Sequence, residues 1–165
     1  MTTDFKKKME LLAKSKLQQD EDKARSVQNE SERRRETEAA SKQRFNELKK
    51  TIVEPLVKEL NNAFESTGDK FRLFSNDEAK DLSDRVKTFC QIFYFPKGRP
   101  ENLVGLNTAS IRFECFPSRE EVLVSSNTEL RPSYLREIET VALTDFDSDF
   151  IENTISDFVA AMTAE

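Results

Sequence analysis

"KTFCQIFYF", residues 87–95, is the stretch of this 165-residue chain that decides the fold. Aromatic and β-branched residues dominate it, and this composition predicts a β-strand. Successive side chains of a strand point to opposite faces of the sheet. One face would carry Phe89, Phe93 and Phe95, and the other Cys90, Ile92 and Tyr94. Because both faces are apolar, we expect a central strand that is covered on both sides.

Further strands are expected on either side of this one. Residues 71–74 form a short extended or packing segment, and "SIRFECF", 110–116, alternates cleanly between apolar and charged side chains. Residues 121–126 pair back as a hairpin, 137–144 form the last strand, and 148–163 form a final amphipathic helix. Strands joined by short turns predict an antiparallel meander and not a parallel sheet.

A short helix is expected between the first two strands. Ser75 and Glu78 have the spacing of a capping box, in which the two side chains satisfy backbone N–H groups at a helix start. Ala79, Leu82 and Val86 would then share one face of that helix.

Residues 3–67 are rich in helix-forming residues and predict a long helix that ends at Gly68. We expect Pro55 to kink it, since a proline loses one helical hydrogen bond. The stretch "NESERRRETEAASKQR", 29–44, has only two apolar residues, both alanines. Its opposite charges recur at i, i+4, which supports a solvated helix without a hydrophobic face.

These patterns predict an α+β protein with two parts. Residues 1–67 would form a long, highly charged N-terminal helical arm, and residues 68–165 a small antiparallel meander sheet packed by helices. The first 50 residues hold 14 Lys and Arg against 10 Asp and Glu, and the remainder holds 12 against 21. Ten of the thirteen phenylalanines follow residue 70, so the core is expected in the second part.

Several kinds of chemistry are disfavoured. The chain has no histidine and two cysteines, too few ligands for a zinc site, and no phosphate-binding glycine motif. We therefore expect no cofactor, no metal and no enzyme activity, and we interpret Cys90 and Cys115 as buried free thiols. No apolar run is long enough for a membrane span, and the N-terminal residues lack the apolar core of a secretory signal, so a cytoplasmic location is expected.

The expected function is that of a non-enzymatic, oligomerising adaptor or scaffold protein that forms a homodimer or binds another protein. Its arm would pair as a coiled coil, with an antiparallel arrangement favoured because strict heptads are apolar only near their end. The expected self-association residues are Phe5, Met9, Leu12, Phe45, Leu48, Ile52 and Leu56.

Other functions stay open at this point. The basic triplets of the arm could contact nucleic acid, although glutamates surround the second of them. These triplets are Lys6, Lys7 and Lys8, and Arg33, Arg34 and Arg35. The chain could also be a small enzyme with an unrecognised carboxylate site, or the arm could fold only on a heterologous partner. The loop over residues 97–108 is long for a meander connection and is a candidate binding loop.

Overall fold

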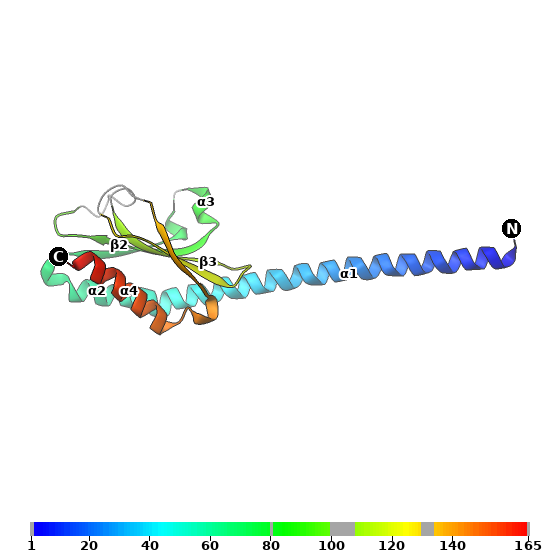
Figure 1. Ribbon diagram of the computed structural model, residues 1–165, viewed down its shortest axis with the longest axis horizontal. Helices are drawn as coiled ribbons and strands as arrows, with labels where there is room; N and C mark the ends of the chain where they lie inside the picture. Colours follow the sequence, from blue (N-terminus) through cyan, green and yellow to red (C-terminus); the bar gives the residue numbers. More distant parts are fainter. Residues whose placement is uncertain (1, 80, 100–107, 130–133, 165) are drawn as a thin grey trace. The chain divides into compact units, whose positions relative to one another are not determined.

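The computed structural model describes residues 2–79, 81–99, 108–129 and 134–164. Contacts divide the chain into two compact units, Met1–Thr37 and Glu38–Glu165. The α+β fold is confirmed: a long N-terminal helix precedes a five-stranded antiparallel sheet and a C-terminal helix (Figure 1). The boundary between the units lies well before residue 67, because the helix residues after Thr37 pack with the sheet.

The first unit is purely helical. Helix α1, Thr3–Leu48, begins here, and every described residue from Thr2 to Glu36 is exposed. Its side chains interact along the helix surface: Arg34 donates to Glu30 over 2.9 Å, and Gln18 donates to Asp22 over 3.0 Å. Such i, i+4 pairs stabilise a helix modestly without burying any surface. The solvated helix predicted for residues 29–44 is therefore confirmed as far as Glu36, but Ser41 is only 3% exposed, so the end of that stretch does bury one side.

The long helix continues through Pro55 by way of a π-helical segment. This segment, Lys49–Val53, is followed by α2, Glu54–Ala63, in which Pro55 lies in the first turn. The Glu54 N–H donates to the Lys49 carbonyl, a wider i→i−5 bond that makes room ahead of the proline ring. The α-helix ends at Ala63, four residues before the expected end, and a separate 3₁₀ turn, Glu65–Thr67, leads to Gly68. Gly68 ends this turn as expected, with a φ of 80°, a left-handed conformation that glycine adopts without strain.

The sheet is a simple meander in which each strand pairs with the next along the chain. Its strands are β1 Lys70–Ser75, β2 Thr88–Phe95, β3 Ala109–Phe116, β4 Glu121–Asn127 and β5 Arg136–Ala142. All pairs are antiparallel, and Ile92 of β2 lies opposite Leu73 on one side and Ile111 on the other. Helix α4, Ser148–Thr163, follows β5 after a short 3₁₀ turn.

One face of the sheet packs against the helices and forms the main core. Cys90, Ile92 and Tyr94 of β2 belong to it, together with the apolar stripe of α2 and of α4. Contacts between phenylalanine rings join the helices to the sheet. The ring centroid of Phe146 lies 5.8 Å from that of Phe45, on which it stacks, and 5.3 Å from that of Phe113. Figure 1 shows α2 and α4 on the same side of the sheet.

The opposite face of the sheet is also apolar. All eight residues of β2 are buried, so the prediction of a central strand covered on both sides is confirmed. On this second face Phe74 lies 6.3 Å from Phe89 and 6.1 Å from Phe93, and the Arg112 guanidinium lies 3.7 Å from the centre of the Phe89 ring. The candidate binding loop falls largely on residues 100–107, which lie outside the described residues.

The short helix differs from its prediction. Helix α3 spans only Leu82–Arg85 and is capped by Asp81, whose carboxylate accepts a 2.9 Å hydrogen bond from the Ser83 N–H. Residues Asn76–Glu78 form a separate 3₁₀ turn, so the expected capping box is wrong. Ala79 is buried, but Leu82 and Val86 are 74% and 80% exposed, because a four-residue helix has no complete apolar face to bury.

Candidate functional site

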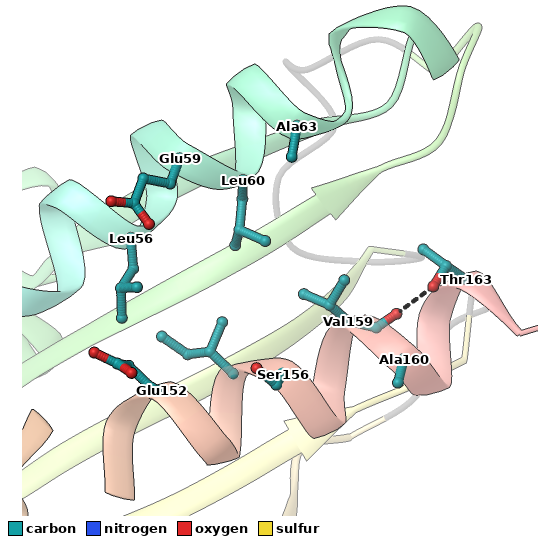
Figure 2. A pocket seen from close by; sticks show the side chains of 10 residues that line it. Leu56, Glu59, Leu60, Ala63, Glu152, Ser156, Val159, Ala160 and Thr163 are labelled. Atoms are coloured by element: carbon teal, nitrogen blue, oxygen red, sulfur yellow. Dashed lines mark hydrogen bonds between the residues drawn. The ribbon is translucent and has the colours of Figure 1, made fainter. Parts of the chain in front are cut away.

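A groove runs between α2 and α4 within the second unit. It has a volume of about 470 Å³ and an apolar floor formed by Leu56 and Leu60 of α2 and Ile155 and Val159 of α4. Figure 2 shows the side chains of Leu56 and Leu60 pointing toward α4, and Val159 pointing toward α2. Ligand-binding clefts are typically concave and mostly apolar, and this groove has both properties.

Helix α4 is held in place at one wall of the groove by its cap and its buried face. The Asp147 carboxylate accepts a 2.9 Å hydrogen bond from the Phe150 N–H and so satisfies one free donor of the first turn. Buried residues then recur at i, i+4, i+7 and i+8 and belong to the core that the helices share with the sheet. They are Ile151, Ile155, Phe158 and Val159.

Small side chains keep the groove open. Ala63 of α2 and Ser156 and Ala160 of α4 line it where larger side chains would fill the space. Thr163 also lines the groove, but its hydroxyl donates a 2.8 Å hydrogen bond to the Val159 carbonyl, so this donor is satisfied within the helix (Figure 2). The groove therefore offers apolar surface along most of its length.

The charged side chains at the groove are acidic. Glu59 and Glu152 line it, and no lysine or arginine belongs to the described lining. Carboxylates beside an apolar floor favour a ligand with an apolar face and basic flanks. The sequence predicts the apolar stripes of both helices but not this groove. The feature of the sequence that could have indicated the groove is the spacing of the small residues in α4.

The expected self-association residues separate into two groups. Phe45 and Leu48 are 1% and 4% exposed and lie in the core of their own unit, and Ile52 and Leu56 are half-buried against it. Their stripe faces the sheet of the same chain, so Phe45 and Leu48 are not available to a second chain. This placement corrects the expectation that the second apolar zone is an open pairing surface.

The tip residues of the arm are accessible. Phe5, Met9 and Leu12 are 48%, 40% and 56% exposed and follow one another along one side of α1. Within the first unit no other element covers them, since that unit contains α1 alone. An exposed stripe of this kind marks an interaction site more often than an isolated surface leucine does.

The basic triplets of the arm are exposed but do not form one patch. The side chains of Lys6, Lys7 and Lys8 project in three directions around α1, as do those of Arg33, Arg34 and Arg35. Within the second triplet Arg34 forms a 2.9 Å ion pair with Glu30.

The described residues contain no group of His, Cys, Asp and Glu side chains that could hold a metal ion, and no helix among them is long and apolar enough to cross a membrane. Cys90 and Cys115 are buried free thiols, as predicted. Burial raises the pKa of the Cys90 thiol to about 12 and that of Cys115 to about 11. Neutral thiols at these depths are poor nucleophiles.

Comparison with known proteins gives no relative from which to read a function: no protein-family model, curated protein or solved structure matches this chain.

Proposed function

We propose that this chain is a non-enzymatic assembly protein that self-associates, with the tip of its N-terminal helix docking on a second copy. The observation that carries the proposal is the exposed stripe of Phe5, Met9 and Leu12. An amphipathic helix commonly binds by laying such a stripe into an apolar groove, with anchors at i, i+4 and i+7. Phe5, Met9 and Leu12 of the tip occupy these three positions.

The occupied site would be the groove between α2 and α4 of the second copy. Its floor is apolar, and its two charged lining residues, Glu59 and Glu152, are acidic. The tip is basic: Lys8 lies three residues after Phe5 and four before Leu12, and Lys16 lies four after Leu12. The lysines that flank the stripe would therefore meet the carboxylates that line the groove.

A symmetric dimer would make this contact twice, since each copy supplies one tip and one groove. Three anchors of this size stabilise an interface by about 1.5–3 kcal/mol each when they become fully buried. Part of that gain is lost to the entropy of association, so we expect an interface of moderate strength.

The test is molar mass by light scattering during size exclusion, with the full chain and single-residue variants. The full chain, 19.1 kDa as a monomer, is expected to run as a dimer at tens of micromolar. Leu12→Ser should raise the dissociation constant at least tenfold, because it removes one of the three anchors. Leu11→Ser is the matched control: Leu11 is 67% exposed and lies off the stripe, so the dimer should persist.

The groove is tested separately with Ala160→Arg, which places a large side chain and a positive charge in the groove at one of its small lining residues. This variant should dissociate the dimer as Leu12→Ser does, while its circular dichroism stays that of the parent. A full chain that is monomeric at all concentrations would overturn the proposed function. A dimer that survives both Leu12→Ser and Ala160→Arg would place self-association elsewhere on the molecule.

A further inference from the structure

A second cavity, apart from the groove, is strongly basic. It has a volume of about 510 Å³ and lies between the end of α1 with the π-helical segment and the stretch around α3. Its charged lining residues are Lys42, Lys49, Lys50, Arg85, Lys87 and the single carboxylate Asp77. Five cations gather here on a chain whose net charge is −5.

One wall is a single helix face. Lys42, Asn46, Lys49 and Lys50 line the cavity at i, i+4, i+7 and i+8. Lys49 and Lys50 are the first two residues of the π-helical segment, a form of helix that is frequent at functional sites. Among the described residues, Lys42, Lys49 and Lys50 take part in none of the ion pairs within 4 Å.

Lys49 is the most informative of these side chains. It is only 8% exposed, yet it has no ion-pair partner among the residues that the structure describes. It also borders a smaller cavity with Glu54 and Glu78, but neither carboxylate forms an ion pair with it. Among the described residues the one buried side-chain nitrogen or oxygen without a partner is Arg112 Nε, so the buried part of Lys49 is its aliphatic stem and its ammonium group reaches the cavity surface. An unpaired ammonium group at the surface of a cavity lined by four other cations is available to bind an anion there.

The other wall is positioned by hydrogen bonds to the backbone. The Arg85 Nε donates to the Ala79 carbonyl over 2.7 Å, and the Asn76 amide donates to the Arg85 carbonyl over 3.4 Å. Lys87 forms an exposed ion pair of 3.3 Å with Asp84, which a stronger anion could displace. Arg85 is thus held at the cavity through one nitrogen, while its two terminal amino groups make no hydrogen bond among the described residues.

From this geometry we infer that the cavity binds a small molecule that carries two or more phosphate groups. Its volume suits a small ligand, which typically occupies 300–1,000 Å³. Lysines and arginine are the side chains that proteins use for phosphate oxygens. A single monovalent anion would leave most of the five cations uncompensated, whereas a di- or triphosphate matches their charge. The concave shape and the acidic remainder of the chain favour a small ligand over a nucleic acid.

Isothermal titration calorimetry of the full chain with inorganic tripolyphosphate tests this inference. Lys49→Met keeps the buried stem and removes the charge, and it should weaken binding at least tenfold. Lys42→Gln should also weaken binding, and since Lys42 is exposed this change does not endanger the fold. The matched control is Lys58→Gln, an exposed lysine of α2 that does not line the cavity, which should bind tripolyphosphate as the parent does.

The outcomes are decisive in both directions. No heat of binding at millimolar tripolyphosphate, or equal weakening by Lys58→Gln and Lys42→Gln, would overturn the inference. A short single-stranded oligonucleotide that binds more tightly than tripolyphosphate and displaces it would assign the cavity to nucleic acid instead. The molar mass of Lys42→Gln should equal that of the parent, which keeps this result independent of the proposed self-association.

Discussion

Two segments of helix α1 have opposite surroundings. In the exposed segment, residues 3–36, every side chain is exposed, whereas in the packed segment, residues 41–48, one side of the helix is buried in the core. The exposed segment depends on helix propensity and on surface pairs worth about a few tenths of a kcal/mol each. The packed segment depends on packing, which is the main source of helix stability in proteins. One continuous helix therefore combines a long solvated segment and a short structural element.

The largest difference is expected between two leucines, one from each segment. Leu48 is 4% exposed and Leu17 is 61% exposed, and both lie in α1. Leu48→Ala should lower the free energy of unfolding by about 2–5 kcal/mol, because it leaves a cavity in the core. Leu17→Ala should change it by less than about 0.5 kcal/mol. Urea denaturation of the two variants at low protein concentration measures both values.

Equal destabilisation by the two substitutions would contradict this difference in burial. It would mean that the surface of the exposed segment is covered in solution as firmly as the core. A concentration-dependent loss for Leu17→Ala alone would point to a partner helix that covers the side of α1 away from Phe5 and Leu12.

The sequence predicted the sheet and the last helix because their patterns are strong. Apolar and charged residues alternate along residues 110–116, and the observed strand, Ala109–Phe116, differs by one residue at its start. The helix expected over residues 148–163 has the observed bounds of α4. In both cases the spacing of the apolar residues shows which side chains are buried, and this burial decides the fold.

The parts that the sequence did not predict depend on contacts between distant residues. The sequence shows the apolar stripe that includes Phe45 and Leu48, but it does not show whether a second chain or the same chain covers the stripe, because that depends on the tertiary structure. The basic cavity was missed for the same reason, since Arg85 and Lys87 join Lys42 only through the fold. For α3, the helical period suggested a buried face, but a four-residue helix is too short to form one.

The second unit is also expected to lose stability at alkaline pH because of its two buried thiols. Burial raises the pKa of Cys90 to about 12 and that of Cys115 to about 11. In the unfolded chain a thiol has a pKa of about 8.5, so as the pH rises the thiols of the unfolded chain lose their protons before those of the folded chain do. Stability should therefore be complete below about pH 8.5 and fall above it, by up to about 1.4 kcal/mol per pH unit for each thiol.

Urea denaturation at several pH values between 8 and 10.5 measures this slope. The double variant Cys90→Ala/Cys115→Ala is the reference: it is less stable at pH 8, but its stability should fall less steeply with pH. If the parent and the double variant have the same slope, groups other than the buried thiols control the alkaline response.

The smallest effect is expected in the exposed segment of α1, where neighbouring arginines provide a matched pair. Arg34 forms a 2.9 Å ion pair with Glu30, whereas Arg33 forms none among the described residues. Arg34→Ala should therefore reduce local helix stability by about 0.2–0.5 kcal/mol more than Arg33→Ala does. Hydrogen exchange of the amides around residue 34 measures this difference. It should vanish in 1 M salt, where the screening length is about 3 Å. A difference that persists in high salt would show that the exposed segment is stabilised by buried contacts, and the contrast between the two segments of α1 would then be lost.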